Sequence, residues 1–285
     1  MIELSGIERQ AGTYRLEIEQ ARLTRGLNLI VGANGAGKTT LIELLTTLQA
    51  PDRGQILYSG REASDHLPLI CSQIGYVPAE IELYGEMKVV RLLKYMAELK
   101  GVYHSDAIDR LMHEFRLEPF KRSKIKHLSQ GVQRRIAVVQ ALLASPLFLF
   151  LDEPLNGMDA EERKFLITYL TQYARTRMVI VAAHELNEWE DAADHIIWIH
   201  RGRIRYNGSP ENWKLGVSSR VWEGEVLLDQ FENIPQEKLI HFRMKEHTMR
   251  VRMMGMQPPL PGFKEMEPTL EDTFFLHMDA LARRG

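Results

Sequence analysis

The sequence predicts an α/β domain that carries a helical insertion and is followed by a small α+β appendage. Short apolar runs alternate with amphipathic stretches over the first 210 residues, as in α/β domains. Two of these runs, 147–151 and 178–182, flank a helix expected at 161–173, which makes a βαβ unit with parallel strands. After Gly208-Ser209-Pro210 the pattern changes to longer strand-like segments.

Periodicity locates the elements of the first domain in chain order. Period-two alternation or a continuous apolar run predicts strands at 14–18, 27–31, 74–77, 147–151 and 178–182, and a hairpin at 196–206. Helical spacing predicts helices at 39–48, 91–99, 108–115, 132–143 and 161–173. The second and third of these helices interrupt the α/β pattern. We therefore expect a domain at 1–215 with a helical subdomain at about 80–145.

The remaining chain, 216–285, is expected to form a separate accessory domain. Strand-like patterns at 221–228 and 239–254 are followed by a proline-rich linker at 258–262. A closing helix is expected at 269–281, with Thr269 as its N-cap and two acidic residues in its first turn.

Composition limits the function classes. With 285 residues and 45% hydrophobic content, the chain is long enough for a sizeable core. The formal net charge of −2 predicts no nucleic-acid partner. The only cysteine, Cys71, excludes an intramolecular disulfide and fits a reducing compartment. The N-terminus has no signal-peptide pattern, and every apolar run falls far short of the roughly 20 residues that cross a bilayer. We expect a cytoplasmic protein that reaches the membrane only through a partner.

Residues 32–39 read Gly-Ala-Asn-Gly-Ala-Gly-Lys-Thr, which matches the P-loop pattern. Its glycines let backbone N–H groups turn inward around a phosphate, and the following helix adds N–H groups and positive dipole potential. We expect Lys38 to reach the β- and γ-phosphates of ATP and Thr39 to bind Mg²⁺. The expected nucleotide-binding set from this region is Gly32, Asn34, Gly35, Ala36, Gly37, Lys38, Thr39 and Thr40.

Two carboxylates, Asp152 and Glu153, follow the apolar strand at 147–151. A buried strand delivers the residues after it to the carboxyl edge of the sheet, where α/β folds bind ligands. We expect Asp152 to hold Mg²⁺ and Glu153 to polarise the attacking water. A general base of this kind contributes about 10²–10⁴ to the rate.

The segments around these sites resemble the motifs of ABC (ATP-binding cassette) ATPases. Residues 128–132 read Leu-Ser-Gln-Gly-Val and resemble the signature, usually Leu-Ser-Gly-Gly-Gln. Residues 156–159 resemble the D-loop, His184 resembles the switch histidine, and residues 75–78 resemble the approach to the Q-loop. The resemblance covers residues 1 to about 210, with five motifs in the family's order.

The resemblance implies a P-loop NTPase of the ABC type that binds Mg-ATP between two subunits packed head to tail. Each subunit would close its signature, Ser129, Gln130 and Gly131, over the ATP held by the other. Asp159 would belong to the D-loop, and His184 would contact the γ-phosphate beside the catalytic Glu153. A homodimer and a heterodimer with a paralogue both remain open.

The sequence departs from the family's pattern at three places. Ala79 stands at the glutamine of the Q-loop and can ligate neither Mg²⁺ nor water, although Glu80 follows it. In the signature, Gln130 replaces the first glycine and Val132 the final glutamine. The aromatic residue that stacks on adenine has only Tyr14 as a candidate. We therefore expect a working but slow ATPase.

The resemblance also implies a partner, a membrane permease on a separate chain, with this subunit at the cytoplasmic face of the membrane. Residues 267–274 resemble the ending of exporter ATPases, which predicts export; an ordinary capped helix would explain them too. The family docks its permease at the segment corresponding to 84–101, where five apolar residues are candidates: Met87, Val89, Leu92, Leu93 and Met96.

Two alternative functions stay open. A nucleotide-sensing, poorly hydrolysing subunit paired with a more active partner would explain Ala79. An ABC ATPase acting on DNA or the ribosome would be expected to show a heptad run or a second P-loop, and the sequence has neither.

Overall fold

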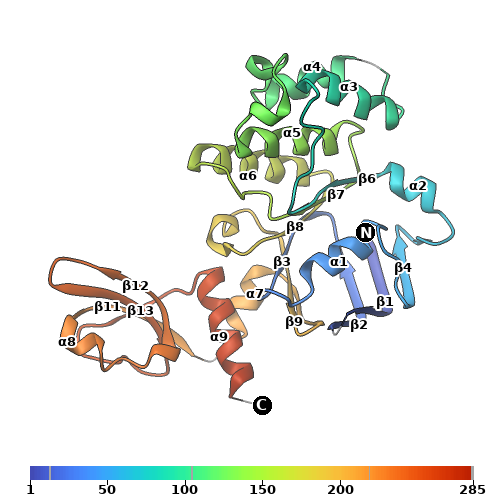
Figure 1. Ribbon diagram of the computed structural model, residues 1–285. Helices are drawn as coiled ribbons and strands as arrows, with labels where there is room; N and C mark the ends of the chain where they lie inside the picture. The colour runs from blue at the N-terminus through green and yellow to red at the C-terminus, as the bar shows by residue number, and fades with distance from the viewer. Residues whose placement is uncertain (13, 104, 218, 284–285) are drawn as a thin grey trace. The chain divides into compact units, whose positions relative to one another are not determined.

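The computed structural model describes residues 1–12, 14–103, 105–217 and 219–283 (Figure 1). They form two compact units. The first combines Met1–His184 with Ala192–Asn207, and the second combines Glu185–Asp191 with the chain from Gly208 onward. This division differs from the expected border after residue 215, because helix α7 (Pro210–Leu215) packs with the C-terminal helix α9 (Leu270–Ala282).

A mainly parallel sheet forms the centre of the first unit. Its strand order is β10-β9-β3-β8-β7-β6, and β3, β7 and β8 are buried along their whole length. Burial on both faces explains why these strands are continuous apolar runs in the sequence. The strands are β3 (Gly26–Val31), β6 (Ile74–Val77), β7 (Phe148–Asp152), β8 (Met178–Ala182), β9 (His195–His200) and β10 (Arg203–Gly208).

A second, antiparallel sheet of the first unit has the order β2-β1-β4-β5. Helix α1 places Leu41 and Leu45 in a core that includes Leu4 of the antiparallel sheet and Phe150 of the central sheet. The P-loop helix is thereby fixed by apolar packing against both sheets. The elements of this layer are β1 (Ile2–Ala11), β2 (Tyr14–Leu23), α1 (Lys38–Leu45), β4 (Arg53–Tyr58), β5 (Arg61–Glu62) and α2 (Leu67–Ser72).

Helices α3, α4 and α5 gather at one end of the first unit (green, top of Figure 1). They are α3 (Val89–Leu99), α4 (Ser105–Glu114) and α5 (Gln130–Leu142), with short 3-10 turns at Glu118–Phe120 and Ile125–His127. Helix α6 (Ala160–Ala174) connects the parallel neighbours β7 and β8. The predicted helical insertion and βαβ unit are both present, and the α/β fold class is confirmed.

The second unit is built on an antiparallel sheet of order β12-β13-β11-β14. One of its cores contains Trp222, Val251, Met253 and Phe263. The strand pattern expected at 239–254 is a hairpin of two strands. The elements are η3 (Leu186–Trp189), α7, β11 (Arg220–Leu227), α8 (Leu228–Phe231), a 3-10 turn at Gln236–Lys238, β12 (Leu239–Met244), β13 (Thr248–Gly255), β14 (Lys264–Met266) and α9. In the described part of the chain, no helix has the length and apolar character needed to span a membrane.

Candidate nucleotide site

The loop between β3 and α1 holds the Lys38 side chain. Lys38 is only 7% exposed, and its Nζ donates to the carbonyl oxygen of Gly32 at 2.8 Å. Gly37 has a φ of 107°, and a Cβ at this position would overlap the Tyr14 hydroxyl, so the position requires glycine. Burial lowers the pKa of Lys38, while the carboxylates of Glu153 and Asp152 raise it. Lys38 is the first residue of α1, and its ammonium is held against the P-loop backbone. The N–H groups at the start of a helix favour a phosphate.

The carboxylates at the end of β7 face the P-loop helix. The Thr39 hydroxyl donates to Asp152 Oδ2 at 2.8 Å, and Asp152 is 2% exposed. Glu153 adopts a left-handed φ of 48°, and its backbone N–H donates to the carbonyl of Ala182 at 3.0 Å. A non-glycine residue in this region is strained, and such residues cluster at functional sites. The backbone thus turns just after Asp152, at the carboxyl edge of the sheet.

His184 lies between Lys38 and Glu153. Its Nε2 is 3.0 Å from Glu153 Oε1, and its Nδ1 is 3.5 Å from Lys38 Nζ. Burial, and then the Lys38 ammonium, lower the pKa of His184, whereas Asp152 raises it. A neutral imidazole with its proton on Nε2 satisfies both neighbours, because Nδ1 then faces the cation and the N–H faces the carboxylate.

These side chains line one cavity of about 520 Å³. Its walls are Ala11, Tyr14, Asn34, Gly35, Ala36, Gly37, Lys38, Thr39, Thr40, Ala79, Asp152, Glu153 and His184. The structure therefore brings together the residues predicted to act on the subunit's own ATP. Gly32 stands just outside the walls and accepts the hydrogen bond from Lys38.

The donor set fits Mg²⁺. A hydroxyl and a carboxylate oxygen face each other at 2.8 Å between Thr39 and Asp152, and Mg²⁺ prefers oxygen ligands. Within the described residues, no group of three or more His, Cys, Asp or Glu side chains forms a metal cage. Mg²⁺ in nucleotide sites is commonly bound through one or two carboxylates plus substrate phosphates, which agrees with this arrangement.

Tyr14 lies in the cavity, but its hydroxyl is occupied. The hydroxyl donates to the carbonyl oxygen of Ala36 in the P-loop, and burial raises the pKa of Tyr14 to about 12. Tyr14 pairs across the β1–β2 hairpin with Ala11, which also lines the cavity. Stacking of Tyr14 on adenine stays a prediction.

The signature does not line this cavity. Ser129 caps α5, and its Oγ accepts the Val132 N–H at 3.3 Å. The Gln130 side chain lies against Gly157 of the D-loop segment and is exposed, whereas Val132 is buried. Asp159 caps α6 in a reciprocal capping box with Glu162. Residues that contact the ATP of a second subunit would have to lie outside the subunit's own cavity, as the signature residues do.

The Q-loop position is occupied by Ala79, which lines the cavity, whereas Glu80 is exposed and does not line it. Sequence reasoning missed Arg134 of α5, which is 7% exposed and donates to the backbone at Pro78 and Ala79. An arginine within a helix gives no local signal of burial, because arginine is usually exposed.

Comparison with known proteins supports the resemblance to ABC ATPases. A family model described as "ABC transporter" matches residues 21–156. A solved structure described as the ATP-binding subunit of an ABC transporter has a TM-score of 0.69 and 27% identity, over 75% of this chain and 92% of that one. The first unit contains an ABC transporter ATP-binding domain.

Curated relatives share this ABC domain. The rat ATP-binding cassette sub-family A member 17 is 33% identical over 65% of the chain and 10% of its own length. The molybdenum import ATP-binding protein ModC of Shewanella oneidensis is 34% identical over 71% of the chain. The chain spans 57% of the length of this ModC.

Proposed function

We propose that the chain binds Mg-ATP, hydrolyses it between two ABC domains, and drives transport through a membrane permease on a separate chain. The observation that supports this most directly is the convergence of Lys38, Asp152, Glu153 and His184 on one cavity beside the P-loop. Catalysis of phosphoryl transfer consists mainly of positioning and charge stabilisation, and these four side chains can supply both.

Each residue has a role that follows from its position. Lys38 would bind the β- and γ-phosphates from the start of α1. Thr39 and Asp152 would hold Mg²⁺, which neutralises charge that develops on the phosphates. Glu153 lies 3.0 Å from the His184 imidazole. Its carboxylate would accept a hydrogen bond from the attacking water, and His184 would orient that water toward the γ-phosphate.

The location of the signature supports an ATP-dependent dimer. Ser129 and Gly131 lie at the N-terminus of the 13-residue helix α5, where free N–H groups and the helix dipole favour an anion. They do not line the subunit's own cavity. Their expected ligand is therefore the γ-phosphate of the ATP that a second subunit binds. Both a homodimer and a heterodimer satisfy this geometry.

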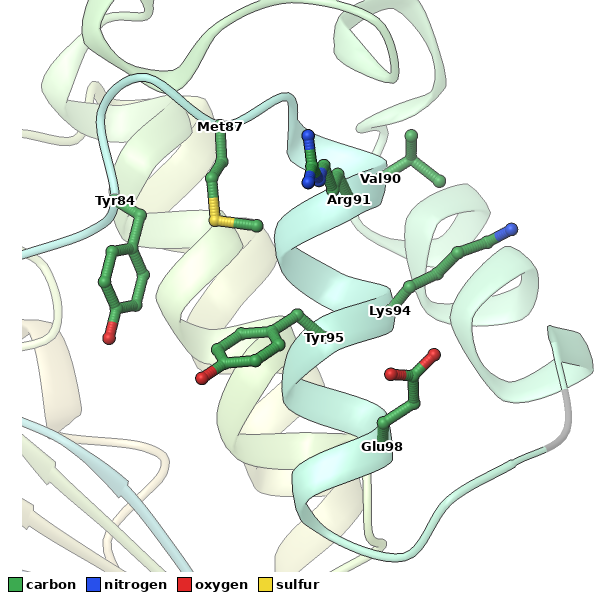
Figure 2. Close-up of a pocket in the computed structure, with 7 residues that line it drawn as sticks. All are labelled: Tyr84, Met87, Val90, Arg91, Lys94, Tyr95 and Glu98. Atoms are coloured by element: carbon green, nitrogen blue, oxygen red, sulfur yellow. The ribbon is translucent and has the colours of Figure 1, made fainter.

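A groove on the helical insertion supports a permease partner. A cavity of about 610 Å³ is lined by Tyr84, Met87, Val90, Arg91, Lys94, Tyr95 and Glu98 (Figure 2). In Figure 2 the hydroxyls of Tyr84 and Tyr95 point to the same side, and their ring centroids are 6.3 Å apart. Three of the residues expected to dock the permease, Val89, Leu92 and Leu93, are buried in the core, so the partner would contact Met87 and the two tyrosines.

The direction of transport depends on the chain's ending. Export was predicted from residues 267–274, but packing accounts for these residues: Thr269 caps α9, and Leu270 and Asp272 are buried. The name of the ModC relative specifies import, so no comparison supports export. Export therefore remains a proposal based on the ending alone, and the transported substrate would be determined by the permease.

The second candidate, a nucleotide-sensing subunit with slow hydrolysis, is favoured by Ala79. Ala79 lines the cavity at the position where the family has a glutamine, and it has no side-chain amide. Such a subunit would bind ATP and dimerise but would leave hydrolysis to a partner.

Mg-ATP turnover of the purified chain beside Glu153→Gln separates the two functions. We expect wild type to release phosphate and the variant to be slower by about 10²–10⁴, because it loses the base. The variant should form a dimer with ATP on size-exclusion chromatography. If both proteins bind ATP but neither hydrolyses it, even with the permease present, the transport-ATPase function would be wrong and the nucleotide-sensing function would be supported.

A further inference from the structure

Arg134 is a buried cation that joins the signature helix to the loop at the nucleotide cavity. Its Nη1 donates to the carbonyl oxygen of Pro78 at 3.0 Å, and its Nη2 donates to that of Ala79 at 2.8 Å. These carbonyls follow β6 directly, and Ala79 itself lines the cavity. The planar guanidinium is thus used as a fork on two consecutive backbone acceptors, which fixes both position and orientation.

The charge of Arg134 is stabilised from the catalytic side. Desolvation lowers the pKa of Arg134, and the Asp152 and Glu153 carboxylates raise it. The guanidinium therefore senses the same two carboxylates that face the nucleotide. Burial of a charged group is costly, so this arrangement needs its two carbonyl acceptors to persist.

The next residue of α5, Arg135, makes contacts of a different kind. Its Nη1 donates to the carbonyl of Phe115 at 2.8 Å, and its Nη2 lies 3.0 Å from Glu162 Oε1. Glu162 also packs against Gly131, where a Cβ would overlap its carboxylate, and receives the N–H of Asp159 at 3.3 Å. Successive arginines therefore tie the signature helix to the Q-loop on one side and to the D-loop helix on the other.

We infer that Arg134 is a positioning residue that couples the nucleotide cavity to the signature, in place of the missing glutamine side chain. The inference rests on the proposed function, since it needs ATP to drive dimer formation. Ala79 has no side-chain polar group that could link bound Mg-ATP to the helical insertion. Arg134 makes this link from α5, because its guanidinium donates to the backbone carbonyls of Pro78 and Ala79. A shift of the loop at Pro78 and Ala79 would therefore move α5 as well. Ser129 and Gly131, at the N-terminus of α5, are then aligned with the second subunit's ATP.

The test compares Arg134→Met and Arg134→Lys with Arg135→Lys, all in the Glu153→Gln background that accumulates the dimer. Two quantities are measured: the affinity of the monomer for a fluorescent ADP analogue, and the ATP concentration at half-maximal dimerisation by analytical ultracentrifugation. We expect Arg134→Met to bind ADP within about twofold of its parent but to need at least about tenfold more ATP to dimerise. Arg134→Lys keeps the buried charge but lacks the planar fork, so it should show a smaller shift in the same direction.

Several outcomes are decisive. Dimerisation of both Arg134 variants at the parent's ATP concentration would overturn the inference. Loss of ADP affinity in step with dimerisation would also overturn it, because Arg134 would then only support the fold. Should Arg134→Met not fold, Arg134→Lys alone carries the comparison. An equal shift in Arg135→Lys would assign the coupling to α5 as a whole rather than to the Q-loop contact. Failure of the Glu153→Gln parent to dimerise would instead count against the proposed function.

Discussion

Each unit of the protein buries one aspartate almost completely, and the two carboxylates are stabilised in opposite ways. Asp152 in the first unit and Asp272 in the second are both 2% exposed. Asp272 accepts from Arg252 Nε at 2.9 Å, from the Thr269 N–H at 2.8 Å and from the Thr269 hydroxyl at 3.0 Å. Asp152 accepts from one neutral donor, the Thr39 hydroxyl.

Two cations near Asp152 donate to backbone carbonyls rather than to its carboxylate. Lys38 donates to Gly32, and Arg134 donates to Pro78 and Ala79, although both feel the charge of Asp152. A buried charge without a paired counter-ion is costly, so it indicates a position where a ligand supplies the cation. The comparison separates a carboxylate that holds the fold together from one that is available to Mg²⁺.

The largest effect is expected from Asp152→Asn. The amide is a weaker Mg²⁺ ligand than the carboxylate, and metal stabilisation of the transition state is worth several kcal/mol. We expect phosphate release from Mg-ATP to fall at least about 100-fold. The thermal midpoint without nucleotide should fall less than it does for Asp272→Asn, because Lys38 and Arg134 donate to backbone carbonyls and not to Asp152. If the midpoint falls as much as it does for Asp272→Asn, the Asp152 carboxylate stabilises the fold and is not reserved for Mg²⁺.

Asp272→Asn is expected to act on stability instead. Removing one partner of a buried ion pair costs about 3–5 kcal/mol, and water reaches part of Arg252, so we expect about 2–3 kcal/mol. Hydrogen exchange of the amides of α9 measures this loss within the second unit. The matched control is Asp279→Asn, which removes an i,i+4 pair with the half-exposed Arg283 on the same helix. It should cost at most about 0.5 kcal/mol. Equal effects of the two variants would contradict the distinction.

The contrast between the two aspartates also explains what the sequence could predict. The carboxyl edge of β7 follows from local order alone: a buried apolar run ends and two acids come next. The P-loop and α1 are likewise contiguous in the chain, so the sequence analysis singled out every residue that lines the cavity except Ala11.

What the sequence could not predict depends on distant contacts. Asp272 was expected only as a favourable charge in the first turn of a helix, because its partner Arg252 lies on β13, 20 residues away. The same is true of Arg134, whose acceptors are 55 and 56 residues earlier in the chain. Strand β1 was missed although its residues alternate. The segment Glu185–Asp191, expected in the first domain, belongs to the second unit, because Glu190 accepts the N–H of Leu270 at 2.6 Å.

The smallest effect is expected on the histidines of the two units. His184 in the cavity and His277 on α9 both have a pKa below the usual 6.5, with desolvation as the first cause. Only His184 is also lowered by a neighbouring cation, Lys38, whereas the carbonyl of Trp213 raises the pKa of His277. Lys38→Met should therefore raise the pKa of His184 and leave that of His277 unchanged.

NMR titration of the imidazole Cε1 resonances measures both values, and a His184→Gln spectrum assigns the first. Since His184 stays neutral down to a pH below 6.5, a step that needs its neutral form keeps its rate at pH 7 and loses it only as the pH falls through that lowered pKa. Lys38→Met should then move the His184 titration toward neutral pH. A His184 titration that ignores the loss of Lys38 would mean that desolvation alone holds the imidazole neutral. In that case the charges of the nucleotide cavity would act on the phosphates but not on His184.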